Sequence, residues 1–162
     1  MQIGQAAAQK LAVPGSALLA LLIGTCVYLV DRDWATVQFL APFAALQGEQ
    51  ANLFGVLGQV LPAACHAYAF TLLLILALGC SRRARVLGTF GWFLLAAALE
   101  VLQAERVSAA LSGLAALLPE SQGFSSIINY AVNGRFDPGD LLAAALGCAA
   151  AFLVVSVPEA ET

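Results

Sequence analysis

The chain has 162 residues, of which 61% are hydrophobic and only 10% are charged. Because ordinary soluble domains carry about 25% charged residues, this composition predicts an integral membrane protein. The formal net charge is -3 and no basic stripe follows the chain, which argues against nucleic acid as a partner. A chain of this length suits a single domain with room for about four spans of roughly 20 residues each.

The first predicted span covers residues 11–30, with Lys10 before it and Asp31-Arg32-Asp33 after it. A signal peptide is the competing interpretation, but it would have an apolar region of roughly 7–15 residues and a small-residue cleavage site. Here the apolar stretch leads directly into charged residues, so we expect a retained helix. A weak likeness to a lipoprotein cleavage box around Cys26 leaves lipidation as an alternative that we disfavour.

The second and third predicted spans cover residues 60–80 and 85–103 and are joined by a short basic turn. The turn Ser81-Arg82-Arg83-Ala84-Arg85 holds three of the seven basic residues. Short loops that are rich in lysine and arginine stay in the cytoplasm. This hairpin is therefore predicted to point inward, and Lys10 places the N-terminus on the same side.

The fourth predicted span covers residues 141–157 and precedes Pro158 and an acidic tail. Four spans place both termini in the cytoplasm, in a multi-pass protein of the bacterial inner membrane. The long connections, residues 31–59 and 104–139, then face outward. The first is rich in aromatic and apolar residues that suit the membrane interface, and the second has apolar residues at helical spacing that stop at Pro119.

The predicted fold is therefore all-α, a bundle of four transmembrane helices with short interfacial helices in the outer loops. An alternative for the helical stripe in the second connection is packing against the bundle, and the two interpretations are compatible. All 162 residues are expected to form this single domain.

Several polar side chains are predicted to meet at the outer ends of the spans. His66 lies one to two turns inside the second span, and Glu100 and Gln103 share one face at the end of the third. Asp137 and Asp140 flank Pro138-Gly139 just before the fourth span, where a carboxylate can cap a helix and meets the positive end of its dipole. Ionisable groups at such positions usually serve a function.

We take His66, Glu100 and Asp140 as candidate catalytic residues, and Gln103, Arg135 and Asp137 as candidate substrate-binding residues. Several of these residues have a structural alternative. His66 can be held by a hydrogen bond to a neighbour, Asp140 can serve only as a helix cap, and Arg135 can snorkel to lipid head groups.

Three short motifs resemble the VanZ-like family in their order and spacing. They are His66-Ala67-Tyr68-Ala69-Phe70, Leu99-Glu100-Val101-Leu102-Gln103, and Gly134-Arg135-Phe136-Asp137-Pro138-Gly139-Asp140-Leu141-Leu142. The resemblance covers about residues 61–152 and implies a small multi-helix membrane protein, first linked to glycopeptide antibiotic resistance, without a well-defined activity. The chain departs from the family where Pro62-Ala63-Ala64-Cys65 replaces an acidic and a basic residue before the histidine, and where Ala144 replaces an asparagine.

We expect no metal and no cofactor. One histidine with acidic residues is a poor zinc-ligand set, and the chain lacks a phosphate-binding loop, a nucleophile elbow and a dinucleotide fingerprint. The four cysteines form no C-x-x-C pair. By the predicted topology only Cys26 and Cys65 lie near the outer surface, so whether these two pair is left open.

Two functions fit this sequence. In the first, the protein binds or modifies a lipid-linked phosphate or glycan head group at the outer face, with His66 as acid–base or nucleophile, Glu100 orienting it, and Arg135 meeting negative charge. In the second, it is a non-enzymatic accessory subunit whose alanine-rich helices pack against a larger membrane assembly. Membrane lipids are partners in the first case, and another membrane protein is the partner in the second. A transporter is disfavoured because four spans offer no obvious inverted repeat with broken helices.

Overall fold

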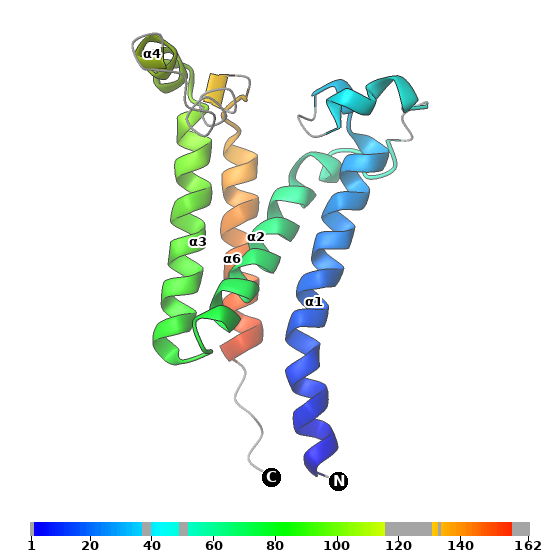
Figure 1. Ribbon diagram of the computed structural model, residues 1–162, viewed down its shortest axis with the longest axis vertical. Coiled ribbons are helices and arrows are strands. Elements are labelled where there is room, and N and C mark those ends of the chain that lie inside the picture. Colours follow the sequence, from blue (N-terminus) through cyan, green and yellow to red (C-terminus); the bar gives the residue numbers. More distant parts are fainter. Residues whose placement is uncertain (1, 37–39, 49–51, 116–130, 133, 157–162) are drawn as a thin grey trace.

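The computed structural model is all-helical over the residues that it describes, which are 2–36, 40–48, 52–115, 131–132 and 134–156 (Figure 1). Four of its helices are long and apolar enough to cross a membrane. The elements in chain order are α1 (Gln2–Asp31), the 3₁₀ helices η1 (Trp34–Thr36) and η2 (Ala41–Leu46), α2 (Leu57–Ala77), α3 (Arg82–Leu102), α4 (Glu105–Ala115) and α6 (Pro138–Ser156).

The four predicted spans are confirmed, with shifted boundaries. The apolar helices cover Ala12–Asp31, Leu57–Ala77, Arg82–Leu102 and Pro138–Ser156, so the last three begin three residues earlier than the apolar pattern predicts. Polar first turns explain part of the shift. The Ser81 side chain caps α3 by accepting the Ala84 N–H at 3.1 Å, and α6 begins with a proline, which suits a first helical position.

Successive long helices run in opposite directions, so the helix ends fall into two groups (Figure 1). The basic turn between α2 and α3 lies at the same end as the start of α1 and the end of α6. The opposite end carries η1, η2 and α4, and we call it the upper end. The helix ends that carry most of the candidate residues thus gather at the upper end, opposite the basic turn. Which side of the membrane each end faces stays a prediction.

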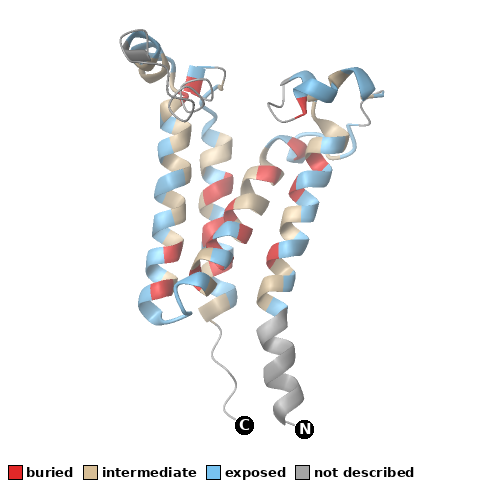
Figure 2. Ribbon diagram, viewed as in Figure 1, coloured by how far each residue is buried: buried red, intermediate tan, exposed pale blue. Residues whose placement is uncertain are grey.

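Helix α2 is the centre of the bundle. It packs on α6, α1 and α3, and its buried residues include Ala67, Leu72 and Ile75. A Cβ atom at Gly147 of α6 would clash with the backbone carbonyl of Ala64, so this glycine lets α2 and α6 approach closely. Most of the buried residues lie on these two helices (Figure 2).

The short helices occur in the two connections where the sequence predicts them. Helices η1 and η2 lie between α1 and α2, and α4 follows α3 at the upper end (Figure 1). Their position at a membrane interface stays a prediction, and the predicted stop at Pro119 lies outside the described residues. All four cysteine thiols are free, with Cys26 exposed and Cys148 buried.

Candidate functional site

The charged triplet after α1 ties the first connection to the bundle. Both carboxylate oxygens of Asp31 accept backbone N–H groups, from Leu53 and from Phe54, each at 2.7 Å. The Arg32 guanidinium donates to the carbonyl of Gln59 at 2.6 Å. The Gln47 side chain donates to the carbonyl of Arg32 at 2.7 Å and accepts the N–H of Trp34 at 2.8 Å. These bonds fold the connection back onto the ends of α1 and α2.

His66 lies half-buried between α1 and α2 in a row of aromatic rings. Its ring stacks on Tyr28 with centroids 5.8 Å apart, and it also contacts Phe70 at 6.2 Å. Phe70 in turn stacks on Trp92 at 4.8 Å. A Cβ atom at Gly24 would lie only 3.5 Å from His66 Nε2, so the ring sits close against α1. Ring packing therefore fixes the orientation of the histidine.

Glu100 and Asp137 meet where α3 ends and α6 begins. Glu100 Oε2 accepts the Asp137 N–H at 3.2 Å, and this contact ties Glu100 to α6. Asp137 Oδ1 accepts the Gly139 N–H at 2.7 Å, so Asp137 is the side chain that caps α6. Asp140 lies one turn further on, inside the helix. The negative charges of these three carboxylates repel one another at this junction.

Asp140 has an opposite charge near it that the sequence analysis missed. The charges of Asp140 and Arg32 interact electrostatically, and each side chain has one buried polar atom without a hydrogen-bond partner: Oδ1 of Asp140 and Nε of Arg32. Arg32 follows Tyr28 by four residues, a spacing that puts both on one face of a helix. The guanidinium carbon indeed lies 5.9 Å from the Tyr28 ring centroid, so this spacing could have identified Arg32 from the sequence. In the sequence, Arg32 marks only the end of the first span.

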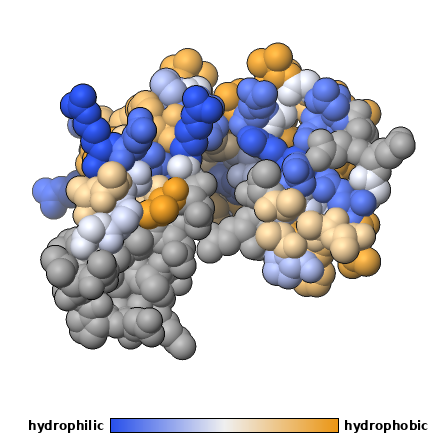
Figure 3. Space-filling view, turned by 90° about the horizontal axis from the view of Figure 1, so that it is seen from above, coloured by the Kyte–Doolittle hydropathy of each residue, from blue (hydrophilic) through white to orange (hydrophobic). Residues whose placement is uncertain are grey.

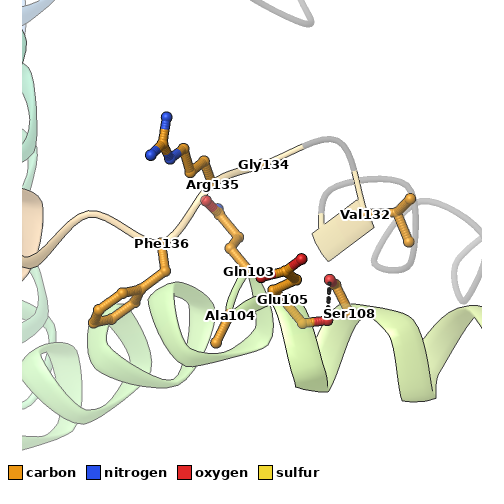
Figure 4. Close-up of a pocket in the computed structure, with 8 residues that line it drawn as sticks. All are labelled: Gln103, Ala104, Glu105, Ser108, Val132, Gly134, Arg135 and Phe136. Carbon is orange, nitrogen blue, oxygen red and sulfur yellow. Dashed lines mark hydrogen bonds between the residues drawn. The ribbon is translucent and has the colours of Figure 1, made fainter.

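A pocket of about 570 Å³ opens at the upper end beside α3 and α4 (Figure 4). Its lining comes from three places, the end of α3, the start of α4 and the segment before α6, and consists of Gln103, Ala104, Glu105, Ser108, Val132, Gly134, Arg135 and Phe136. Gln103 is buried and its side chain lies against Gly134, where a Cβ atom would overlap it. Glycine at this position therefore lets the segment before α6 pass over Gln103.

The six predicted site residues thus fall into three places. Gln103 and Arg135 both line the pocket, Asp137 does not, and a role of these residues in substrate binding stays a prediction. Glu100, Asp137 and Asp140 gather at the α3–α6 junction. His66 stands apart against Tyr28, and the structure shows no hydrogen bond between it and the described carboxylates. Within the described ranges, no three histidine, cysteine, aspartate or glutamate side chains converge as metal ligands.

Glu105 and Ser108 are pocket residues that the sequence analysis did not single out. Both lie in the first turn of α4, and Ser108 Oγ donates to the carbonyl of Glu105 at 3.2 Å. The sequence feature that could have identified them is that both lie off the apolar face of the predicted helix. The predicted helix starts directly after Gln103, so its polar face indicates residues that face the same pocket as Gln103.

Comparisons of this chain with models of known protein families, with characterised proteins and with solved structures find no match. The architecture itself defines the class. Its four helices are long and apolar enough to cross a membrane, as in a multi-pass membrane protein.

Proposed function

We propose that the chain is a VanZ-like protein of the bacterial cell envelope that binds the phosphate-bearing head group of a lipid at the outer face of the inner membrane. The observation that carries this proposal is the upper-end pocket, whose lining includes an exposed arginine together with an amide, a hydroxyl and a carboxylate. The guanidinium of Arg135 offers a planar set of donors that matches a phosphate.

The depth of the pocket suits a lipid head group. Helix α3 has 21 residues and so is about 31 Å long, close to the hydrocarbon thickness of a bilayer of about 30 Å. Gln103 is the residue that follows this helix, and the pocket begins there. A bilayer that matches α3 therefore places the pocket in the head-group layer, within reach of a lipid phosphate.

The polar lining favours a head group that carries hydroxyls as well as one negative charge. Gln103 and Ser108 offer neutral hydrogen-bonding groups, while Glu105 repels a second negative charge. His66 is packed between rings away from this pocket. The geometry thus supports binding more directly than conversion, and the catalytic roles of His66, Glu100 and Asp140 stay predictions.

A lipid-binding measurement tests the proposal. The purified protein in neutral-lipid nanodiscs is titrated with phosphatidylglycerol, and binding is followed by native mass spectrometry. We expect Arg135→Gln to weaken binding about tenfold, because a charge-assisted pair is lost. Arg83→Gln removes the same charge from the basic turn at the other end and should change binding much less. Equal effects of the two variants would refute the assignment of the pocket.

The second function, an accessory subunit of a membrane assembly, draws support from α1. This helix packs mainly on α2, and its Leu18, Leu19 and Leu22 are more than half exposed. Most of the small residues of α6 are buried within the bundle, but Ala149 and Ala150 are exposed, so a partner would meet leucines together with these two alanines. Purification in mild detergent separates the two proposals: a stoichiometric partner protein favours the subunit, and a stable lone protein that binds lipid argues against it.

A further inference from the structure

Three polar side chains that line the upper-end pocket make no hydrogen bond or ion pair of their own within the described residues. They are the amide of Gln103, the carboxylate of Glu105 and the guanidinium of Arg135. Gln103 is only 9% exposed, and buried polar groups in native proteins are almost always hydrogen-bonded. Its amide is therefore available for hydrogen bonds to a molecule bound in the pocket.

Gln103 connects the two charged residues of the pocket. Glu105 follows it by two residues and is the first residue of α4. On the other side, the Gln103 amide lies against Gly134, and Arg135 is the next residue (Figure 4). A volume of about 570 Å³ is ordinary for a small-molecule pocket, so one head group can contact all three side chains. Seen from above, hydrophilic side chains cover much of this end of the molecule (Figure 3).

The opposite charges of Glu105 and Arg135 favour a ligand that carries opposite charges of its own. Glu105 weakens the attraction of the pocket for a purely anionic head group, and the same charge attracts a cation. A phosphate accepts hydrogen bonds from the guanidinium, while an ammonium donates them to the carboxylate. The amide oxygen of Gln103 and the hydroxyl of Ser108 accept a hydrogen bond from an ammonium as well as from a hydroxyl.

We propose that the pocket recognises a zwitterionic lipid head group in which a phosphodiester carries a primary amine, an inference that rests on the proposed function. Arg135 binds the phosphate, Glu105 binds the ammonium, and the amide of Gln103 accepts a further N–H of the ammonium. The helix dipole of α4 also favours an acid at Glu105, but it does not explain an arginine in the same pocket. Both charged side chains are exposed, so the head group has access to them.

Two lipids that differ only at the end of the head group test this recognition. Phosphatidylethanolamine carries the ammonium, and phosphatidylpropanol carries a methyl group at the same position. We expect the protein in nonionic detergent to bind the first about tenfold more tightly by native mass spectrometry. Water-soluble glycerophosphoethanolamine has the same polar group without acyl chains and should compete poorly. Competition as strong as that of the lipid itself would overturn the assignment of the pocket to a lipid.

Variants of Glu105 test the role of its charge. Glu105→Gln should weaken phosphatidylethanolamine binding about tenfold and tighten phosphatidylpropanol binding, because the charge that attracts one lipid repels the other. Glu105→Asp, which keeps the charge on a shorter side chain, should restore part of the preference. Asp33→Asn removes the same charge from the first connection, outside the pocket, and should leave the ratio of the two affinities nearly unchanged. A thermal melting curve in detergent confirms that each variant is folded.

The absolute affinity for phosphatidylethanolamine separates recognition from general electrostatics. Loss of a negative charge that does not contact the ligand would tighten binding of the anionic lipid and leave the net-neutral lipid almost unaffected. Recognition requires that phosphatidylethanolamine binding itself falls in Glu105→Gln. An unmodified protein without a preference, or an unchanged affinity for phosphatidylethanolamine in this variant, would overturn the inference while binding through Arg135 still stood. Failure of both lipids to bind would overturn the proposed function as well.

Discussion

The two connections at the upper end are built in different ways. The first, between α1 and α2, is tied down by side chains that bond to distant backbone, from Asp31, Arg32 and Gln47. The second, from α3 to α6, contains the pocket, and the side-chain bonds of its described residues are mostly to near neighbours, as in Ser108 with Glu105. Its long-range bond is the one from the Asp137 N–H to Glu100. Among the described residues, the long-range side-chain bonds thus lie mainly in the first connection and the pocket in the second.

The two connections therefore differ in what they contribute to the upper end. A segment fixed by several buried or partly buried bonds opens rarely, whereas a segment held mainly by local bonds opens at little free-energy cost. Binding residues often lie on such loops, positioned by a rigid scaffold. Bonds of the first connection hold Arg32 in place, and the second connection supplies the residues that line the pocket.

The largest expected effect concerns the side of the membrane on which both connections lie. In a variant without native cysteines, Leu46→Cys and Glu105→Cys probe the two connections and Arg83→Cys probes the basic turn; all three positions are exposed. We expect a membrane-impermeant thiol reagent to label the first two on spheroplasts, and the third only after permeabilisation. Labelling of all three from one side would contradict the four-span threading.

The transmembrane spans and their order can be predicted from the sequence because each span depends only on its own run of apolar residues. An apolar run of about 20 residues must form a helix in lipid, where each backbone group needs an internal partner. Helix starts are predicted less well, since Arg82 and Pro138 belong to first turns that the apolar pattern leaves out. The presence of Gln103 and Arg135 in one pocket could also be predicted, because α3 and α6 run in opposite directions and the end of α3 therefore lies near the start of α6.

The rest of the site depends on tertiary contacts that no local pattern encodes. The bonds from Asp31 to Leu53 and Phe54 cross more than 20 residues, at separations of 22 and 23. The stacking of Tyr28 on His66 depends on how α1 crosses α2. Arg32 was overlooked because a charge after a span is usually only a boundary signal. The interaction of Arg32 with Asp140 arises from packing around the first turn of α2.

The next largest effect compares one carboxylate from each connection. Asp31→Ala removes two hydrogen bonds to a charged acceptor and should lower the free energy of unfolding by about 3 kcal/mol. Glu105→Ala removes an exposed carboxylate from the second connection and should change stability by less than about 0.5 kcal/mol. Thermal melting in detergent measures both, and amide exchange at Leu53 and Phe54 should rise only in the first variant. Similar losses in the two variants would remove the contrast between the connections.

Gly134→Ala should lower stability only a little but weaken lipid binding more strongly. A methyl group there overlaps the Gln103 side chain, which must move, so Gly134→Ala reshapes the pocket. Because the end of a glutamine side chain is flexible, we expect a stability loss of only about 1 kcal/mol. Phosphatidylglycerol binding should nevertheless fall several-fold. Gly113→Ala is the matched control on α4, since no atom lies within 4 Å of its Cβ position and alanine favours the helix. If both variants bind the lipid equally well, the position of the Gln103 side chain does not matter for binding.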